Sequence, residues 1–284
     1  MYEKVYEKDY IEIFKLTDQV YFRYADWDKR QQCNGGYIVF KDFVAVIDAP
    51  SIDGANEMSA ETAQLFGKPI KYVFLTHGHF DHADGLPVFA KLGATAIGSR
   101  NMLAKLKAGG AATPELAIGI ETSARIEICD TTFELFTIPG AVHSEEDLFI
   151  TIPAEKMIFT GDAVAELPNL FFGNGDFNNW LSTLGVIEAM DFATICVGHG
   201  RIKDNSHFGI QKTYFKALDD AINAQISAIG QGATAGKAED AAKKFAIAAI
   251  NSDVNPGAAK AVEMAGKPIA EKHIAALYLK HIKI

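Results

Sequence analysis

The chain has 284 residues, 49% of them hydrophobic, which predicts a stable globular fold with a full core. Its formal net charge is −9 and its Lys and Arg residues are scattered, so nucleic acid is not an expected partner. No stretch approaches the roughly 18 apolar residues of a membrane-spanning helix, and the first residues carry no signal-peptide pattern. We therefore expect a cytoplasmic protein without membrane contact. The alternative is a periplasmic or secreted protein whose export signal was removed.

The first part of the chain alternates strand-like and helix-like patterns. Residues 11–16, 19–24, 37–40 and 43–47 are rich in β-branched and aromatic side chains, which predicts consecutive antiparallel strands. Helical spacing over 54–66 and an apolar run at 71–75 then predict a βαβ passage. Cys33, Cys129 and Cys196 lack the short spacings of a zinc knuckle or redox pair and are expected to be buried thiols.

Helical patterns dominate residues 84–124, with a short strand near 95–98. Strand patterns return at 125–128, 132–138, 148–152 and 157–160. Two groups of strands with helices among them predict an α/β fold of two packed sheets covered outside by helices.

The composition changes from about residue 206 onward, where Ala and Lys become frequent and apolar side chains recur at helical spacing. We expect a main domain at 1–205 and a helical C-terminal extension at 206–284. The extension packs either on the main domain or on a second subunit, which would make a homo-oligomer.

Four side chains with metal-binding chemistry follow the predicted strand at 71–75. They are His77, His79, Asp81 and His82. In an extended stretch His77 and His79 point to the same side, so one metal ion can bind both. A turn at Asp81, before a helix beginning near Asp84, would bring Asp81 and His82 to a second ion. Imidazole and carboxylate are ligands that zinc prefers.

Four ligands are too few for two ions, and three further candidates occur later in the chain. His143, Asp162 and His199 each come just past the end of a predicted strand. Each residue alone has an ordinary explanation as a capping, surface or turn residue. Their joint occurrence at strand ends, downstream of a four-ligand cluster, favours a shared metal site.

Residues in this order and spacing resemble the metallo-β-lactamase superfamily over residues 10–202. The signature His-x-His-x-Asp-His stands at 77–82, and the family's later histidine, Gly-Asp and Gly-His steps match His143, Asp162 and His199. The resemblance implies an αβ/βα four-layer sandwich with its site along one edge, to which this chain adds a helical appendage. It assigns His77, His79 and His143 to a first ion, Asp81, His82 and His199 to a second, and Asp162 to a bridge between them.

Two other groups of residues have an ambiguous role at this level. The resemblance matches Asp48 to a family aspartate at the end of an early strand. This residue either orients a ligand histidine or closes an ordinary turn. Phe171, Phe172 and Trp180 follow Asp162 in the chain and either wall a substrate pocket or belong to the core.

Together these features predict a hydrolase that holds two divalent metal ions, with zinc favoured and iron also accepted by the ligand set. Two neighbouring cations would lower the pKa of a shared water from about 15.7 to about 7 and so supply hydroxide. The expected substrate is a small-molecule ester, thioester, lactone or lactam. Asp81 or Asp162 would accept and return a proton as catalytic residues.

Departures from the family patterns leave several alternatives open. Asp162 stands where the best-known zinc β-lactamases carry a cysteine, but β-lactamases that lack this cysteine still fit. His79 stands where the diiron flavoproteins have an acidic ligand, and an iron-dependent oxidoreductase such as a persulfide dioxygenase still fits. The large insertion of RNA-processing nucleases is absent. Glyoxalase II activity is permitted, although no basic cluster for a glutathione carboxylate is evident. A non-catalytic metal-binding module is the last alternative.

Overall fold

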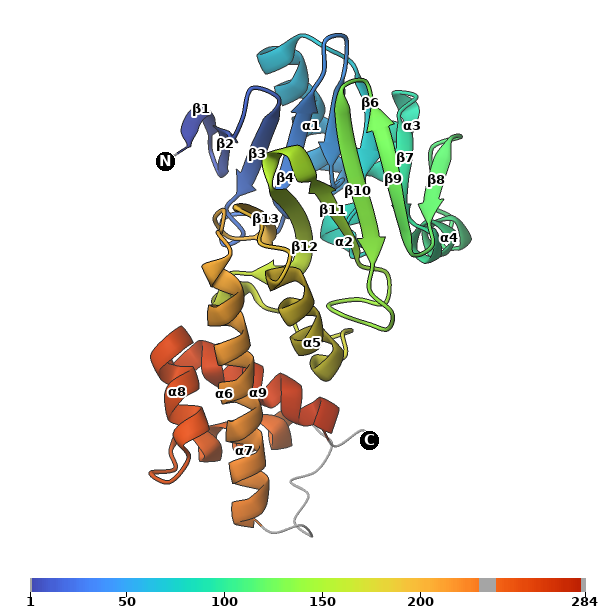
Figure 1. The fold of residues 1–284 in the computed structure, drawn as a ribbon. Helices are drawn as coiled ribbons and strands as arrows, with labels where there is room; N and C mark the ends of the chain where they lie inside the picture. The colour runs from blue at the N-terminus through green and yellow to red at the C-terminus, as the bar shows by residue number, and fades with distance from the viewer. Residues whose placement is uncertain (1, 230–238, 282–284) are drawn as a thin grey trace.

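Two β-sheets stacked face to face form the body of the protein (Figure 1). The computed structural model describes residues 2–229 and 239–281. The first sheet contains, in spatial order, β1 (Glu3–Lys8), β2 (Ile11–Lys15), β3 (Val20–Ala25), β4 (Gly35–Val39), β5 (Val44–Ile47), β6 (Ile70–Phe74), β7 (Thr95–Ser99) and β8 (Ala117–Ile120). The second contains β13 (Thr194–His199), β12 (Met157–Ala165), β11 (Leu148–Ile152), β10 (Thr131–Thr137) and β9 (Ser123–Ile128).

Both sheets are mixed. Neighbouring strands from β1 to β5 are antiparallel, and those from β5 to β8 are parallel. In the second sheet only β12 and β13 run parallel to each other. Because β5, β6 and β7 point the same way, the chain leaves them at one edge of the sheet, where ligand sites of α/β folds commonly lie.

The central strands are apolar on both faces because both faces are covered. In β5, Val44 and Val46 face the helices, whereas Ala45 and Ile47 face the other sheet. The helices on that outer side are α1 (Ile52–Phe66), α3 (Leu86–Lys91) and α4 (Arg100–Ala108). On the outer side of the second sheet lie α5 (Phe177–Glu188) and α6 (Ser206–Ile229). The layers are therefore helix, sheet, sheet and helix, which confirms the predicted αβ/βα sandwich.

The C-terminal helices pack on this body instead of projecting from it. α6 is followed by α7 (Glu239–Ile250), α8 (Pro256–Ala265) and α9 (Lys267–His281), with α8 against α6 and α9 against α7. One apolar cluster joins Trp180 of α5 and Phe215 of α6 to Phe245, Ala258 and Leu277 of the later helices. The end of β12 is also bonded to α6, since Gln211 donates to the Ala163 carbonyl and His207 contacts the Ala165 carbonyl.

The structure differs from the sequence prediction mainly at sheet edges. β1 was not predicted, and β8 occupies part of a segment expected to be helical. Both are edge strands with largely exposed side chains, so they lack the apolar alternation that identifies a half-buried strand. Cys129 is exposed and not buried as expected, because it lies with positive φ in the turn between β9 and β10.

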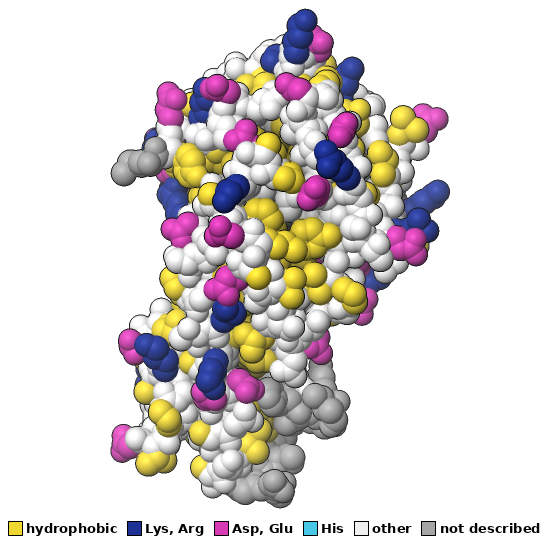
Figure 2. Space-filling model, viewed as in Figure 1, with side chains coloured by type: hydrophobic (Ala, Val, Ile, Leu, Met, Phe, Trp, Pro, Cys, Tyr) yellow, Lys and Arg dark blue, Asp and Glu magenta, His cyan; other side chains and the backbone are white. Residues whose placement is uncertain are grey.

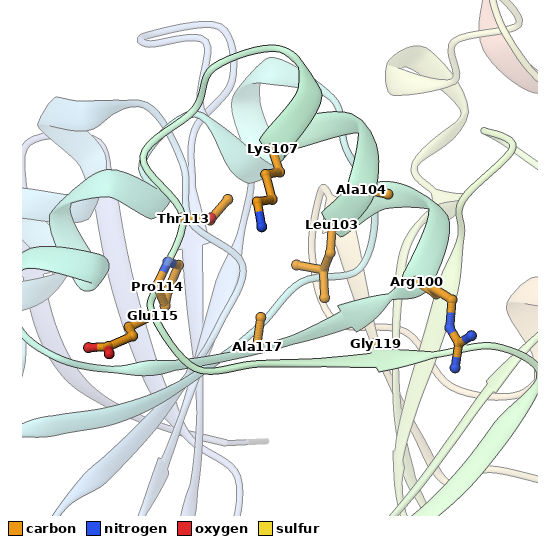
Figure 3. Close-up of a pocket in the computed structure, with 9 residues that line it drawn as sticks. All are labelled: Arg100, Leu103, Ala104, Lys107, Thr113, Pro114, Glu115, Ala117 and Gly119. Atoms are coloured by element: carbon orange, nitrogen blue, oxygen red, sulfur yellow. The ribbon is translucent and has the colours of Figure 1, made fainter.

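The surface shown in Figure 2 carries Lys and Arg side chains interspersed with Asp and Glu. Among the helices that the structure describes, none combines the length and the apolar character needed to span a bilayer. A hollow of about 410 Å³ lies between α4 and the segment leading into β8 (Figure 3). None of the seven candidate ligands lines this hollow, so it is separate from the candidate metal centre.

Candidate metal centre

The segment after β6 supplies four of the candidate ligands. The strand ends at Phe74, and a short helix α2 (Phe80–Ala83) begins six residues later, earlier than the start near Asp84 predicted from the sequence. Asp81 and His82 therefore lie on a helical turn, whereas His77 and His79 lie on the preceding loop. This change from extended chain to helix directs the two pairs of side chains to neighbouring positions.

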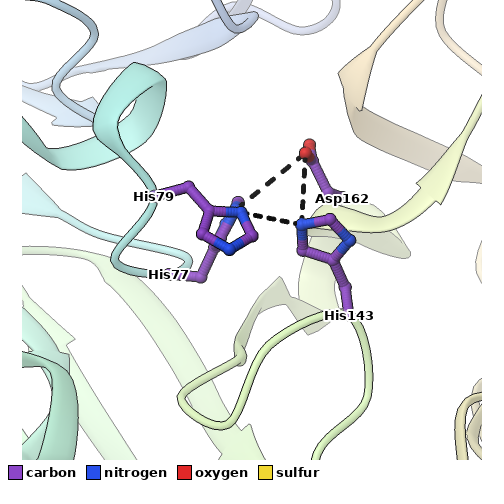
Figure 4. A group of neighbouring side chains, drawn as sticks. All are labelled: His77, His79, His143 and Asp162. Carbon is purple, nitrogen blue, oxygen red and sulfur yellow. Dashed lines mark hydrogen bonds and ion pairs between the residues drawn. The ribbon is translucent and has the colours of Figure 1, made fainter. Parts of the chain in front are cut away.

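The first group of side chains contains His77, His79, His143 and Asp162, which point toward one another in Figure 4. His79 Nδ1 lies 3.0 Å from His77 Nε2 and 2.9 Å from His143 Nε2. Two nitrogens bound to one tetrahedral zinc ion at 2.0–2.1 Å would lie roughly 3.3 Å apart. The three ring nitrogens thus have the spacing of ligands around a common centre.

The second group contains Asp81, His82, Asp162 and His199. His199 Nε2 lies 3.1 Å from Asp81 Oδ2 and 3.3 Å from Asp162 Oδ2. His82 Nε2 lies 3.2 Å from the other oxygen, Asp162 Oδ1. Asp162 belongs to both groups, because its Oδ2 also lies 3.5 Å from His143 Nε2. The structure thus brings all seven predicted residues together from separate parts of the chain.

Asp162 reaches the centre from within a strand, whereas the sequence places it just past one. β12 continues to Ala165, and its register against β13 shifts at Gly161, whose φ is +51°. This irregularity moves the Asp162 carboxylate out of the regular alternation and toward the histidines. A side chain at Gly198 on the neighbouring strand would lie 1.9 Å from Asp162 Oδ1, so only glycine leaves room for the carboxylate there.

Asp48 holds the segment that carries the first ligands. Its carboxylate accepts hydrogen bonds from the Thr76 backbone N–H at 2.7 Å and from the Thr76 hydroxyl, and it lies 2.8 Å from His82 Nδ1. The last contact fixes Nδ1 as the donor nitrogen, so that Nε2 of His82 keeps its lone pair for the centre. Asp48 is buried and adopts φ +61°, a conformation that Asp tolerates better than most residues.

The loop that carries His143 is fixed at both ends. Asn179 at the start of α5 donates to the carbonyls of Pro139 and Ala141, at 3.0 and 2.8 Å. Beyond His143, Asp147 accepts hydrogen bonds from the backbone N–H and the hydroxyl of Ser144, at 2.8 and 3.0 Å. Burial raises the pKa of Asp147 to about 7. The ligand histidine therefore lies on a loop whose shape is set by its own hydrogen bonds.

Comparison with known proteins shows the family. A family model described as the metallo-beta-lactamase superfamily matches residues 28–199, which is more than half of the chain. The chain belongs to the metallo-β-lactamase superfamily. A hydroxyacylglutathione hydrolase from Ruegeria pomeroyi is 27% identical over 169 residues, which cover 58% of this chain and 61% of that protein. The chain thus spans about three fifths of the length of this relative.

Solved structures share the fold. A metallo-beta-lactamase from Pontibacter korlensis has a TM-score of 0.64 at 18% identity, covering 72% of this chain and 99% of that one. A metallo-beta-lactamase from Erythrobacter litoralis has a TM-score of 0.63 at 16% identity, covering 74% and 98%. Because these structures are less than 25% identical to the chain, they show that it shares their fold.

The electrostatics of the site fit the divalent ions that this superfamily typically binds. Burial lowers the pKa of His143 to about 3 and that of His77 well below its ordinary value. Both rings are therefore neutral, and each has a nitrogen lone pair that can bind a cation. Burial would raise the pKa of Asp162, but His199 and His82 hold it well below its ordinary value. His82 Nε2 and Asp162 Oδ1 are buried without a hydrogen-bond partner. Histidine lone pairs and carboxylates that face one another in this way repel each other, and cations bound between them would relieve this repulsion.

The aromatic residues after Asp162 divide between pocket wall and core. Phe171 is 52% exposed, and its ring centroid lies 6.1 Å from that of His79 and 6.2 Å from that of His143. Phe172 and Trp180 are buried in the cluster that joins α5 to the C-terminal helices. Of the three residues considered, only Phe171 is thus placed to contact a substrate.

Sequence reasoning missed two further residues beside the centre. The Trp27 ring packs edge-on against His199, with centroids 4.5 Å apart, and Asn174 Nδ2 lies 3.1 Å from His79 Nε2. Both residues lie on irregular segments without a periodic pattern, so nothing in their surroundings in the sequence marked them. A hollow of about 310 Å³ also borders Gly78 and is lined by Met102 and Leu106 of α4.

Proposed function

We propose that this protein is a dinuclear metal-dependent hydrolase that cleaves a small-molecule ester, thioester, lactone or lactam. The observation that carries the proposal is the position of Asp162 between two sets of donor atoms. One oxygen of its carboxylate lies 3.5 Å from His143 Nε2 and 3.3 Å from His199 Nε2. A carboxylate shared in this way is suited to bridging two neighbouring ions.

The donor set favours Zn²⁺, since neutral imidazole and carboxylate groups in a compact arrangement suit this ion, although iron accepts the same ligands. His77, His79 and His143 would hold one ion, Asp81, His82 and His199 the other, and Asp162 both. When bound, two such ions supply Lewis acidity and lower the pKa of water to near neutrality.

The protein's own residues would then orient substrate and carry protons. Asp81 is buried and its Oδ2 lies 3.1 Å from His199 Nε2, so one carboxylate oxygen would help to hold the second ion while the other takes a proton and returns it to a leaving group. Phe171 and Trp27 flank the histidines and offer apolar surface to the non-reacting part of a substrate.

A direct test combines metal analysis with a substrate panel. Protein purified without added metal is expected to contain about two ions per chain, mainly zinc. The panel would contain a hydroxyacylglutathione thioester, chosen because of the named relative, together with a lactone and a chromogenic cephalosporin. Oxygen uptake with a persulfide would be measured in parallel, because uptake with bound iron would favour the oxidoreductase alternative instead.

Two aspartates on the same segment give a matched pair of variants. Asp81→Asn is expected to lower kcat/KM by roughly 10²- to 10⁴-fold through loss of a proton acceptor and ligand. Asp84→Asn changes an exposed side chain three residues later and should leave kcat/KM near that of the wild type. Equal activity of the two variants would contradict the proposed site.

A further inference from the structure

The loop between β12 and α5 contacts both the metal centre and the C-terminal helices. We call residues 170–176 the bridging loop. On the side of the centre, Asn174 Nδ2 lies 3.1 Å from His79 Nε2, and the Phe171 ring faces the rings of His79 and His143. The bridging loop therefore contacts the outer side of the first group of histidines.

The bridging loop is also packed tightly against the segment that carries His143. A side chain at Gly175 would lie 1.9 Å from the Val142 carbonyl oxygen and 3.1 Å from His143 Cα. Only a glycine allows the two backbones to approach so closely. A shift of the bridging loop would therefore be transmitted to both His79 and His143.

On its other side, the bridging loop is held by α9. The Lys280 ammonium donates a hydrogen bond to the Gly175 carbonyl, next to Asn174. His273, about two helical turns before Lys280 on the same face of α9, packs edge-on against Phe172 with ring centroids 5.2 Å apart. The His273 ring is itself fixed by the Tyr214 hydroxyl of α6, 2.8 Å from its Nδ1. The helical extension thus contacts the loop at two points.

The chemistry of His79 defines what Asn174 must do. His79 turns Nδ1 toward His77 and His143, so a neutral His79 that gives its Nδ1 lone pair to the centre carries its hydrogen on Nε2. The partner of Nε2 must then be an acceptor. A 180° turn of the Asn174 amide exchanges its oxygen and nitrogen, and so brings the carbonyl oxygen to the place of Nδ2, 3.1 Å from His79 Nε2, where it can accept this hydrogen bond.

We propose that Asn174 is a positioning residue for His79 and that α9, through Lys280, holds Asn174 in place. This inference rests on the proposed function, since it assumes that His79 binds an ion through Nδ1. Acceptors on the outer nitrogen of a ligand histidine fix its tautomer and ring orientation. Asp48 has this role toward His82, and Asn174 has it toward His79. The C-terminal extension thereby supports the metal centre through the bridging loop.

Asn174 is tested by zinc affinity, measured by competition with a chromogenic chelator. Asn174→Leu removes the acceptor and is expected to weaken the affinity for the ion that His79 binds by about 10- to 100-fold. Asn174→Asp keeps an acceptor and should stay near the wild type. Asn178→Ala, an exposed change nearby on α5, is the matched control. Affinities of Asn174→Leu equal to those of Asn178→Ala would overturn the assignment.

Lys280 is tested by amide hydrogen exchange over residues 170–176, which needs neither turnover nor bound metal. Lys280→Met is expected to speed exchange in the bridging loop, whereas Lys280→Arg retains a donor and should not. Lys272→Met, at an exposed lysine of the same helix, is the control, and the melting temperature of each variant reports global folding. Equal exchange in Lys280→Met and Lys272→Met would refute the role of α9.

The two proposals fail in different ways. Wild-type protein that binds no pair of ions and hydrolyses none of the substrates refutes the proposed function. Wild-type protein that binds two ions, with Asn174 and Lys280 variants indistinguishable from their controls, refutes only the positioning role.

Discussion

Replacing Asp48 by Asn tests how the second group of ligands is oriented. The substitution preserves size and tolerates the positive φ at this position, but it exchanges one carboxylate oxygen for an NH₂ group. The Thr76 backbone N–H and His82 Nδ1 both need an acceptor, at 2.7 and 2.8 Å, and an amide provides only one. If the oxygen stays with Thr76, the NH₂ group faces His82 and makes its Nδ1 an acceptor.

Two magnitudes follow from this geometry. Losing one charge-assisted hydrogen bond in a buried site should lower the free energy of unfolding of the metal-free protein by about 1.5–3 kcal/mol. Reversal of the His82 tautomer puts a hydrogen on Nε2, which faces Asp162 and Asp81, so this ring can no longer bind an ion. The affinity of the corresponding ion should fall by about 10- to 100-fold, the usual effect of removing an outer partner of a ligand.

The assay combines urea unfolding of metal-free protein with zinc titration against a chelator. Asp53→Asn is the control, because this aspartate is exposed and its ion pair with Arg30 contributes no more than about 1 kcal/mol. An Asp48→Asn variant that unfolds and binds zinc as the control does would refute the orienting role of Asp48.

Three further changes test the packing around the site. Trp180→Ala, at a fully buried ring, should lower the free energy of unfolding by about 3–5 kcal/mol in urea titrations, and a loss below 1 kcal/mol would contradict its place in the core. Gly198→Ala should displace the Asp162 carboxylate, so zinc stoichiometry is expected to fall; retention of two ions would show that the strand adapts. Burial lowers the pKa of His273 to about 3, so below about pH 6.5 the unfolded chain takes up a proton that the folded chain excludes. The free energy of unfolding should therefore fall as the pH is lowered below about 6.5. His273→Gln should reduce the slope of this free energy against pH by up to about 1.4 kcal/mol per pH unit, and identical slopes in the two proteins would contradict the low pKa of His273.

Strong periodic patterns made the sheets predictable from sequence. The strands around Val46 and Ile150 are covered on both faces, and their continuous apolar runs mark them clearly. β1 and β8 were not predicted, because edge strands bury few of their side chains. The start of α2 at Phe80 was also missed, since a four-residue helix is too short for a helical period to show.

The candidate ligands could be proposed from the sequence because only a few residue types bind metal ions. Their spacing can be read from the sequence even when the bounds of the strands are misjudged. The structure places Asp162 among the other candidate ligands although it lies inside β12, because the irregularity at Gly161, which no sequence pattern marks, turns its carboxylate toward them. Asn174 and Trp27 could not be found in this way. Their proximity to His79 and His199 depends on where irregular segments fold back, which tertiary packing alone decides.

The bonds between β12 and α6 bear on where this chain can be divided. The carbonyls of Ala163 and Ala165 lie just beyond Asp162 and are bonded to Gln211 and His207, both on the far side of residue 205. A fragment ending at that point would expose these carbonyls together with the apolar surface around Trp180. An exchange of the helical C-terminal extension between relatives would therefore need compensating changes on both sides of residue 205.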